Sequence, residues 1–390
     1  MAAFEGVDYY ALDGLLSDEQ KLVRATVREF VSDKILPVID EHQREGTFPV
    51  EALPVMADMG LLGANLEGYG LPGLDNISYG LILQELERGD SGLRSFVSVQ
   101  GALCMYPIWR YGSEAQKQQW LPAMGRGDVI ACFGLTEPDA GSDPGARRTC
   151  AEFDGDEWVL NGVKYWITNG TIAQLAIVWA KTDKGIRGFL VPTDTPGFSA
   201  NKVTGKYSLR VSDTAELVLQ DCRISADNVL PDAEGLKGPL TCLNQARYGI
   251  SWGAVGAAMA CYDEALRYAK NRIAFGRPVA ATQLMQELLV ECVTEITKAQ
   301  LMCLRLGQLK EAGTVTPQQV SMAKRNNVLM ALNTARTCRE ILGGNGILYD
   351  YQSFRHMVNL ESVYTYEGTH QIHTLIVGHD ITGYPAFGER

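Results

Sequence analysis

The stretch Gly134-Leu135-Thr136-Glu137-Pro138-Asp139-Ala140-Gly141-Ser142-Asp143-Pro144 has neither the period of a helix nor that of a strand. It combines two glycines, two hydroxyl side chains and three carboxylates in one loop-forming segment. In such a loop, free backbone N–H groups suit the polar edge and the phosphates of a large cofactor, as do the hydroxyls of Thr136 and Ser142. We therefore expect this loop to belong to a cofactor site.

The region that contains this loop, residues 131–235, has the period of β-strands. Two apolar runs flank Asn161-Gly162, a dipeptide that predicts a two-residue hairpin turn. Further strands are expected over residues 175–179, 188–191 and 216–219. Because no segment of helix length separates these runs, the pattern predicts an antiparallel sheet and not a parallel one with helical crossovers.

Before this region, residues 17–130 have a helical pattern. Ser17 with Gln20 and Ser113 with Gln116 are capping boxes, which mark helix starts. After the first box an apolar stripe follows at helical spacing, formed by Leu22, Val23, Val27, Phe30 and Val31.

After the β-region, residues 238–385 are expected to form long helices. Thr316-Pro317-Gln318-Gln319 opens one that can run to Leu342, where Gly343-Gly344 ends it. Residues 252–260 are rich in Ala and Gly, which permits close helix packing, and four long helices imply a bundle. The sequence thus predicts an α+β chain with a helical domain over 1–130, a β-domain over 131–235 and a helical bundle over 236–390.

Composition excludes several classes of protein. The chain has 390 residues and a formal net charge of −11, which argues against binding to nucleic acid or to an anionic membrane surface. Nine scattered cysteines without a CxxC pair argue against disulfides or zinc and for a reducing compartment. The N-terminus resembles no targeting segment, and no run of about 18 apolar residues exists. We expect a cytoplasmic protein, or a mature chain of the mitochondrial matrix. His370 and His373 alone predict no metal site, because no third ligand is evident.

Two further motifs complete the pattern. Trp166-Ile167-Thr168 places an aromatic plane beside a hydroxyl, and Tyr364-Thr365-Tyr366-Glu367-Gly368-Thr369-His370 lies near the C-terminus. Together with the loop at 134–144, these segments resemble the acyl-CoA dehydrogenase family, which uses FAD. The resemblance covers nearly the whole chain. It implies an N-terminal helical domain, a central antiparallel β-domain and a C-terminal four-helix bundle.

The chemistry of this family requires a base for the α proton of an acyl thioester, a hydride acceptor over the β carbon, and donors to the thioester oxygen. Glu367 matches the catalytic base of the glutaryl-CoA branch. Its neighbours Val363, Tyr364 and Tyr366 form an apolar setting that would raise the pKa of its carboxyl group. The backbone N–H of Glu367 would be one donor to the thioester oxygen, and the flavin ribityl chain the other.

The resemblance also implies the cofactor contacts. Phe133, Leu135 and Thr136 would lie at one edge of the flavin ring, and Trp166, Ile167 and Thr168 on its other side. The family shares each FAD between subunits. The residues that match this contact and a further flavin contact are Arg272, Phe275, Gln283, Gly343, Gly344 and Thr369. The run 342–346 is not a dinucleotide fingerprint, because no strand precedes it.

Residues 85–100 are expected to set the choice of acyl group. A helix carrying Glu87, Arg94, Ser95 and Ser98 presents polar groups to one region. A buried, unpaired Arg94 would cost several kcal/mol, and a carboxylate on the substrate would relieve that cost. The pattern therefore favours a dicarboxylic acyl chain over a plain fatty one.

The same residues resemble the glutaryl-CoA branch, in which the Arg binds the distal carboxylate. The substrate-binding residues implied in total are Glu87, Arg94, Ser95, Ser98, Ser142, Asn244, Arg247, Tyr366 and Gly368. The implied reaction is oxidation of glutaryl-CoA followed by loss of CO2 to give crotonyl-CoA, a step of lysine and tryptophan degradation. Electrons would pass to electron-transfer flavoprotein, and the chain would form a homo-oligomer, expected as a tetramer.

Departures from the family pattern leave alternatives open. Gln371 stands where Asp is usual, Gly101 and Ala102 replace a Ser pair, and 210–214 and 69–71 also differ. The alternatives are a non-decarboxylating glutaryl-CoA dehydrogenase and an enzyme for another short acyl-CoA or dicarboxylyl-CoA. A flavin-binding scaffold or a flavin monooxygenase of the same fold is disfavoured, because neither needs Glu367 as a base.

Overall fold

The N-terminal helices carry the expected start signals. A computed structural model describes residues 4–386. Both predicted capping boxes are present, at Ser17 before α1 and at Ser113 before α7. Leu22 was wrongly placed in the apolar stripe, because its side chain is 67% exposed whereas Val27 and Phe30 are buried. The helices are α1 (Asp18–Phe30), α2 (Ile39–Glu45), α3 (Leu53–Asp58), α4 (Asn76–Gly89), α5 (Ser91–Ser98), α6 (Tyr106–Tyr111) and α7 (Glu114–Gly125).

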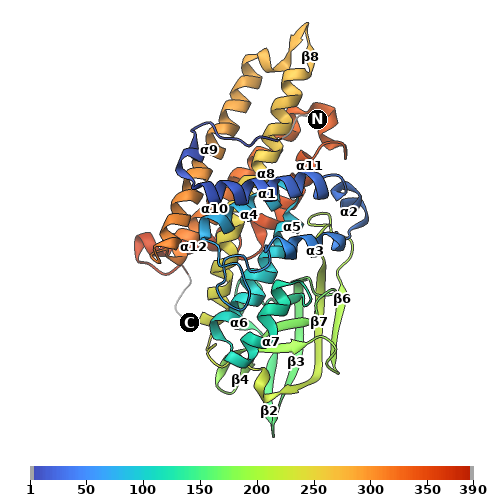
Figure 1. Cartoon of the computed structure of the whole chain (residues 1–390), viewed down its shortest axis with the longest axis vertical. Coiled ribbons are helices and arrows are strands. Elements are labelled where there is room, and N and C mark those ends of the chain that lie inside the picture. Colours follow the sequence, from blue (N-terminus) through green and yellow to red (C-terminus); the bar gives the residue numbers. More distant parts are fainter. Residues whose placement is uncertain (1–3, 387–390) are drawn as a thin grey trace.

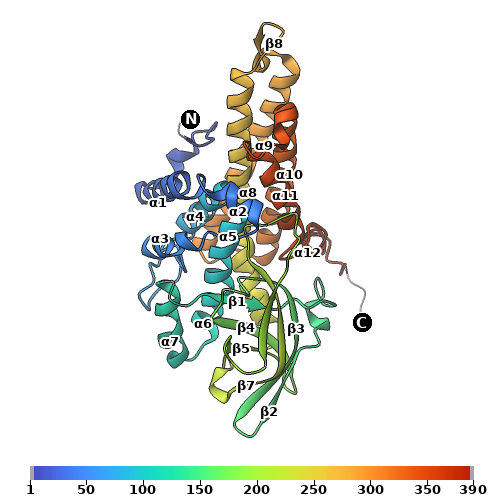
Figure 2. The ribbon, with the colours of Figure 1, turned by 90° about the vertical axis from the view of Figure 1, so that its right-hand side faces the viewer.

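A seven-stranded sheet within the described residues occupies one end of the molecule, at the bottom of Figures 1 and 2. Its order is β1-β4-β2-β3-β7-β6, with β5 also paired to β4. The strands are β1 (Ala131–Gly134), β2 (Cys150–Asp154), β3 (Glu157–Thr168), β4 (Leu175–Thr182), β5 (Gly185–Pro192), β6 (Phe198–Lys202) and β7 (Thr214–Ser225).

The sheet is mainly antiparallel, but the expectation of a wholly antiparallel sheet was wrong. β1 pairs with β4 in parallel, and so does β2 at one residue pair. Parallel neighbours need a long crossover, which is usually a helix. Here the loop after β1 and the β2–β3 hairpin make that crossover. Because the crossover contains no α-helix, the sequence pattern did not predict the parallel pair.

The predicted hairpin turn at Asn161-Gly162 is also wrong. These residues lie inside β3, and the β2–β3 turn is at Gly155-Asp156 instead. At Asn161 the register of β3 and β7 shifts, and the Asn161 side chain hydrogen-bonds Asp221 of β7. Glycine is needed at 162 because a Cβ there would lie 2.7 Å from the Cα of Thr149. A close backbone contact, and not a turn, therefore explains this dipeptide.

The C-terminal half forms the predicted bundle. It comprises α8 (Lys237–Asn271), α9 (Gln283–Glu311), α10 (Pro317–Ile341), α11 (Ser353–Thr365) and α12 (His370–Thr382), with the small hairpin β8 (Ile273–Ala274) and β9 (Arg277–Pro278) after α8. That hairpin lies at the end of the molecule farthest from the sheet (Figure 1). α10 begins with its capping box and ends before Gly343, as predicted.

Glycines let α4 approach α8 closely. A Cβ at Gly256 would overlap the backbone carbonyl of Gln84, and a Cβ at Gly80 would overlap the ring of Trp252. The expected role of the Ala- and Gly-rich segment is thus confirmed, and α4 is held against the centre of the bundle.

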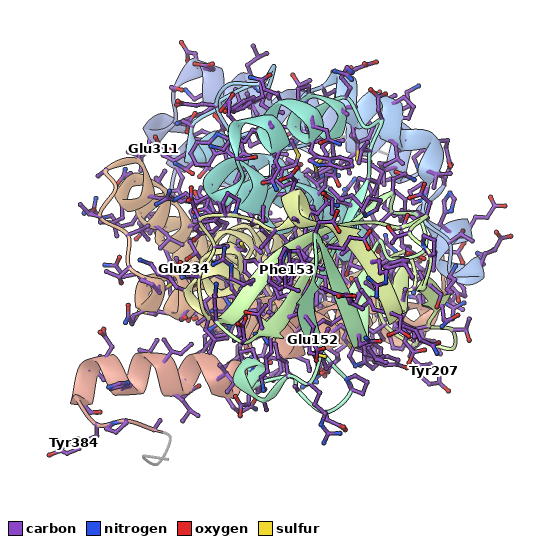
Figure 3. All side chains as sticks on the ribbon, turned by 90° about the horizontal axis from the view of Figure 1, so that it is seen from below. Glu152, Phe153, Tyr207, Glu234, Glu311 and Tyr384 are labelled. Carbon is purple, nitrogen blue, oxygen red and sulfur yellow. The ribbon has the colours of Figure 1, made fainter. Side chains whose placement is uncertain are left out.

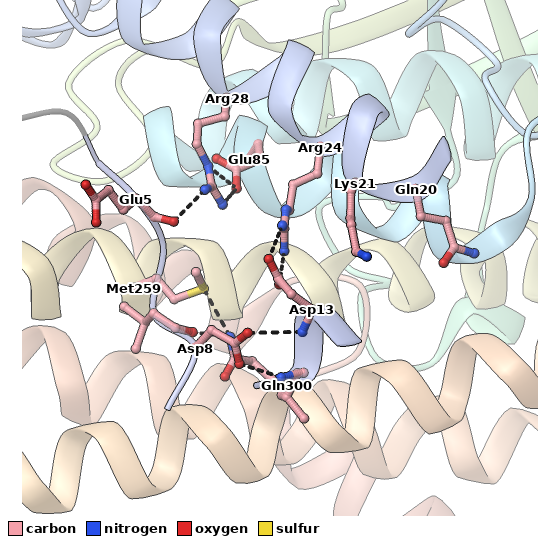
Figure 4. A network of polar contacts seen from close by, with 12 residues as sticks. Glu5, Asp8, Asp13, Gln20, Lys21, Arg24, Arg28, Glu85, Met259 and Gln300 are labelled. Carbon is pink, nitrogen blue, oxygen red and sulfur yellow. Dashed lines mark hydrogen bonds and ion pairs between the residues drawn. The ribbon is translucent and has the colours of Figure 1, made fainter. Parts of the chain in front are cut away.

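The N-terminal segment ties α1 and α4 to the bundle (Figure 4). Arg24 forms an ion pair with Asp13 at 2.6 Å, and Arg28 forms one with Glu85 of α4 at 2.7 Å. Gln300 of α9 donates to the carbonyl of Val7 at 2.6 Å. α4 is therefore fixed on two sides.

At the other end of the chain, α12 extends from the bundle away from the sheet that carries Phe153, with Tyr384 beyond its end (Figure 3). Over residues 4–386, no helix is both long enough and apolar enough to cross a bilayer.

Candidate active site

A break between α4 and α5 brings two predicted substrate residues together. Asp90 is extended at the break, and its carboxylate accepts hydrogen bonds from Gly92 N, Arg355 and Asn359. The break turns Glu87, in the last turn of α4, toward Arg94, in the first turn of α5. Arg94 Nε lies 2.6 Å from Glu87 Oε2, and both side chains are fully buried.

The prediction that Arg94 is unpaired was therefore wrong. The guanidinium is buried, but Glu87 neutralises it, and Ser91 holds the other Glu87 oxygen at 2.8 Å. The sequence pattern suggested one continuous helix. In such a helix, side chains seven residues apart are two turns apart, whereas the break between α4 and α5 brings Glu87 and Arg94 into contact. Burial lowers the pKa of Arg94, but Glu87 and Tyr366 outweigh that effect and raise it, so the guanidinium stays charged.

Tyr366, directly after α11 and far away in the sequence, completes this cluster. Its hydroxyl accepts a hydrogen bond from Arg94 Nη2 and lies 3.3 Å from the Ser95 hydroxyl. Burial raises the pKa of Tyr366 to about 12. Four of the predicted substrate residues, namely Glu87, Arg94, Ser95 and Tyr366, are thus in one cluster. Ser98 is buried nearby on α5, and its hydroxyl has no hydrogen-bond partner among the described residues.

Glu367 lies in the short connection between α11 and α12. Its φ is 50° and that of Gly368 is 92°, both in the left-handed region. A Cβ at Gly368 would lie 2.8 Å from His373 Nε2, so only glycine fits there. Thr369 follows as the N-cap of α12, where its hydroxyl accepts from Ile372 N. Glu367 is therefore held on a tight, non-helical turn between two helices.

The Glu367 carboxyl group has the properties expected of a base that acts on a bound ligand. Burial raises its pKa, while Arg94, Arg247 and Lys324 lower it by a smaller amount. Its Oε2 atom is buried and has no hydrogen-bond partner among the described residues. Native structures rarely leave such an oxygen unpaired, so it points to a donor or a proton that comes from a bound molecule.

The structure places two predicted residues on α8, and one of them, Arg247, supports this turn. Arg247, which is buried, donates from Nε to the Glu367 carbonyl at 2.7 Å. Asn244 lies one turn earlier on the same helix and is half-buried.

Sequence reasoning missed two residues next to Glu367. Lys324 of α10 donates to the carbonyls of Tyr366 and Gly368 at 2.9 and 2.7 Å. Its signal was present, since it stands on the apolar face of that helix with Val320 and Ala323. Tyr79 of α4 is buried, its hydroxyl has no partner among residues 4–386, and Glu367 raises its pKa further after burial. Nothing in the local sequence distinguishes Tyr79 from a core tyrosine.

The two predicted flavin segments meet at one end of the sheet. β1 is at a sheet edge, with Phe133 buried and Leu135 buried just beyond it. Tyr165 N donates to the carbonyl of Thr136 at 2.9 Å, which joins the loop after β1 to β3. β3 has one extra residue relative to β7 between Lys164 and Ile167, a β-bulge.

The bulge displays Trp166. Its φ is 63°, and its ring is 59% exposed although Ile167 beside it is buried. An exposed indole plane next to buried apolar residues, with the hydroxyls of Thr136 and Thr168 at hand, fits the planar ring of a flavin. The residues present therefore fit the cofactor that the family resemblance implies.

Glu137 orders the loop formed by residues 134–144. Its carboxylate accepts from Arg148 N, Thr149 N and the Lys164 ammonium, the last at 2.8 Å. Although burial raises the pKa of Glu137, these donors lower it to about 2. Glu137 is thus a structural anchor, whereas Ser142 lies on the exposed part of the loop.

The flavin segments and Glu367 border a common loop. Leu209 N donates to Asn359 of α11, and Ser208 hydrogen-bonds Ser362 of α11. Four residues later, Asp213 accepts from Asn169 N, just after Thr168. The loop before β7 therefore connects the end of β3 with the helix that leads to Glu367.

The other predicted cofactor residues lie apart from this site within one chain. Arg272, Phe275 and Gln283 are exposed around the β8–β9 hairpin, and Gly343 and Gly344 are exposed after α10. Asn345 hydrogen-bonds Tyr268, which places the glycine segment at the same end of the bundle. Figure 2 shows that end opposite the sheet. One chain does not bring these residues to the flavin segments.

The histidines of α12 have other surroundings. His370 stacks on the ring of Tyr364 with centroids 4.7 Å apart, and His373 is buried. Among residues 4–386, no three His, Cys, Asp or Glu side chains are grouped as a metal site requires.

Comparisons with known proteins agree with this arrangement. Family models for the N-terminal, middle and C-terminal domains of acyl-CoA dehydrogenase match residues 17–128, 132–222 and 233–382. The mitochondrial short-chain specific acyl-CoA dehydrogenase of Rattus norvegicus is 36% identical over 377 residues, 95% of this chain and 92% of that protein.

Two solved structures extend the comparison. A glutaryl-CoA dehydrogenase from Mycobacterium smegmatis in complex with FADH2 is 50% identical with a TM-score of 0.97, covering 98% of this chain and 99% of that one. Butyryl-CoA dehydrogenase from Megasphaera elsdenii is 32% identical with a TM-score of 0.91, covering 94% and 98%.

Proposed function

The chain belongs to the acyl-CoA dehydrogenase family, and from that premise we propose that it is an FAD-dependent glutaryl-CoA dehydrogenase that also decarboxylates its product. As a member of the family it is an oxidoreductase acting on a CH–CH group. The choice among acyl groups, the loss of CO2 and the electron acceptor are the proposed parts.

The observation that carries the choice of substrate is the buried Arg94 in contact with Glu87 and Tyr366. A guanidinium is a planar fork with five N–H donors, so Glu87 and the Tyr366 hydroxyl leave donors for a substrate carboxylate. A plain acyl chain would place a methyl group against this charge. A five-carbon dicarboxylic acyl chain would instead place a carboxylate there, which favours glutaryl-CoA.

Different groups of the chain have different roles in the proposed reaction. Glu367 takes the α proton, for which its unpaired Oε2 and the raised pKa of its carboxyl group are suited. The Glu367 backbone N–H donates to the thioester oxygen, where negative charge develops. FAD, when bound against Trp166, supplies the hydride acceptor. The γ-carboxylate of the oxidised product would then leave as CO2 with the thioester as electron sink, and protonation of the γ carbon would give crotonyl-CoA. The electrons of the oxidation would go on to electron-transfer flavoprotein.

One alternative has support of its own. The relatives that act on short or butyryl chains cover more than nine-tenths of this chain, so a short-chain acyl-CoA without a distal carboxylate is the second candidate. It requires the pocket to accept a methyl group beside the Glu87–Arg94 pair. A glutaryl-CoA dehydrogenase that keeps the carboxyl group is the third.

Product analysis distinguishes these candidates. The purified protein should be yellow with non-covalent FAD, and with glutaryl-CoA and an artificial electron acceptor it should yield crotonyl-CoA and CO2. Glutaconyl-CoA as the end product would rule out decarboxylation. Turnover of butyryl-CoA but not glutaryl-CoA would establish the short-chain alternative, and a protein that cannot be reconstituted with FAD would contradict the whole proposal.

We also propose that each FAD is completed by a second copy of the chain in a homotetramer. The support is the exposure of Arg272, Phe275 and Gly343 at an end of the bundle that does not meet the flavin segments of its own chain.

A further inference from the structure

Three consecutive carbonyls around Glu367 are bound by buried cations. Lys324 Nζ donates to Tyr366 O at 2.9 Å and to Gly368 O at 2.7 Å. Arg247 Nε donates to Glu367 O, between them, at 2.7 Å. Lys324 is only 1% exposed, so these bonds lie away from water.

The turn needs such donors because neither helix can supply them. α11 ends at Thr365 and α12 begins at His370, while Glu367 and Gly368 have positive φ. Left-handed residues lie outside the helical hydrogen-bond ladder, and a buried carbonyl without a donor is unfavourable. A change in the direction of this turn would move both the Glu367 carboxylate and its backbone N–H.

We propose that Lys324 is a positioning residue for Glu367, holding the 366–368 turn and favouring the ionised carboxylate through its charge. This proposal rests on the proposed function, in which Glu367 is the base. The hydrogen bonds of Lys324 go to the backbone carbonyls on either side of Glu367, so its effect passes through Glu367.

The charges that face Glu367 come from several elements. Arg94 of α5, Arg247 of α8 and Lys324 of α10 all lower the pKa of Glu367, whereas burial raises it. His373 of α12 is neutral at pH 7, because burial, Lys324 and Arg247 lower its pKa to about 3, and the pKa of His370 is also lowered by burial. Glu87 is paired with Arg94, and Tyr79 and Tyr366 are uncharged phenols with raised pKa values.

Burial lowers the pKa of Lys324 to about 7, so its ammonium is charged below that pH, and there it favours the ionised form of Glu367. Above that pH the neutral amine still has two N–H groups for the two carbonyls. The positioning effect should therefore persist at alkaline pH, and the electrostatic effect should appear on the acidic limb.

The test compares Lys324→Met, Lys324→Arg and Lys206→Met. Lys206 is a matched control, because it is a lysine of the β-domain that donates to the carbonyls of Leu209 and Ser212 at 2.9 and 2.7 Å. Burial lowers its pKa to about 8. The measurements are kcat/KM against pH with glutaryl-CoA and with butyryl-CoA, bound FAD, and hydrogen exchange of the amides of residues 366–369.

For Lys324→Met we expect a loss of kcat of about 10–10²-fold and an acidic limb moved to higher pH by about one unit, since a nearby opposite charge shifts a carboxyl pKa by about 1–3 units and two other cations remain. Bound FAD should be unchanged, and exchange at 366–369 should be faster. Lys324→Arg keeps the charge and should keep the limb at or below its wild-type pH. Lys206→Met should leave the limb in place.

The results that would contradict the role of Lys324 differ from the result that would contradict the proposed function. If Lys324→Met loses activity without a shift of the limb, or shifts no more than Lys206→Met, Lys324 has only a structural role and the proposal is wrong. If Lys324→Met does not fold, an upward shift of the limb in Lys324→Arg would contradict the proposal just as directly. If the wild-type protein turns over neither acyl-CoA, the proposed function itself has failed.

Discussion

Glu367 is held between two opposing effects, burial and the charge of three cations. Burial dominates, so the carboxyl pKa is raised, while Arg94, Arg247 and Lys324 limit the increase. A base needs this compromise, because a pKa near the working pH combines proton affinity with ionisation. Its buried oxygen Oε2, which has no hydrogen-bond partner among the described residues, can accept the incoming proton.

Glu367→Gln should abolish most turnover. The amide keeps the shape and hydrogen bonding of the side chain but cannot accept a proton, and loss of a general base costs about 10²–10⁴-fold in rate. Bound FAD should not change. Glu361→Gln is the control, since Glu361 is exposed on α11 and pairs only at 3.6 Å with the exposed Arg336. Activity near the wild-type level in Glu367→Gln would show that the base lies elsewhere.

The same substitution should stabilise the protein at neutral pH. A carboxyl group whose pKa is raised on folding contributes stability below its unfolded pKa, and this contribution is lost as pH rises through the folded pKa. Above that pH the ionised, buried group is unfavourable, and the amide avoids this. Melting temperatures of both proteins at pH 4 and pH 8 test the sign: the advantage of Glu367→Gln should be larger at pH 8.

Arg94→Gln should change the preference between glutaryl-CoA and butyryl-CoA, an effect that a loss of folded protein alone would not produce. Removing one partner of a buried pair costs about 3–5 kcal/mol, or roughly 10²–10⁴-fold for a substrate that depends on the charge, at about 1.4 kcal/mol per tenfold. Turnover of glutaryl-CoA should fall strongly, and butyryl-CoA should lose little or gain. The ratio of kcat/KM for the two substrates is independent of how much enzyme is active.

The double substitution Glu87→Gln/Arg94→Gln controls for the buried carboxylate that Arg94→Gln leaves unpaired. It should recover stability but keep the altered ratio. A ratio that does not move toward butyryl-CoA in either protein would remove Arg94 as the carboxylate anchor, and with it the main support for glutaryl-CoA.

At the scale of elements, the site depends on the break between α4 and α5 and on a glycine of α8. The break brings Glu87 and Arg94 together, and Gly253 leaves the space for them, because a Cβ there would overlap the Glu87 carboxylate and lie 3.2 Å from Arg94 Nε. The absence of a side chain at this point of α8 therefore leaves room for the buried Glu87–Arg94 pair.

Gly253→Ala should lower the melting temperature and selectively weaken glutaryl-CoA turnover. Inserting a group into a packed core costs typically about 1–3 kcal/mol, and here the displaced group is the buried ion pair. Gly378→Ala in α12 is the control, since nothing lies within 4 Å of its added Cβ and alanine favours helix by about 0.5–1 kcal/mol. If both proteins show the same melting temperature and substrate ratio, the close packing at Gly253 is not needed.

At the scale of the whole molecule, we expect different roles for its two ends, the end formed by the sheet and the end of the helical bundle farthest from the sheet. The sheet end carries Trp166, and the opposite end carries the exposed Phe275 of the β8–β9 hairpin. Arg272→Ala should therefore reduce FAD retention without a change in acyl preference, whereas Lys270→Ala, at an exposed position on the last turn of α8, should not. Dilution to monomers should release FAD, and full retention in monomers would contradict a shared site.

The sequence by itself determined the order of helical, β and helical regions, the helix starts at Ser17, Ser113 and Thr316, and the family. These depend on residues close together in the chain, through capping, periodicity and short motifs. By resemblance alone, it also predicted that Glu87, Arg94 and Tyr366 belong to one substrate site.

Only the tertiary structure decided the rest, because it depends on contacts between distant segments. It placed Glu87 on Arg94 across a helix break, put Asn161-Gly162 inside β3 against Thr149, and made β4 parallel to β1. It also brought Lys324 to a turn more than 40 residues later, where a lysine on an apolar helix face binds carbonyls that the local sequence leaves without donors.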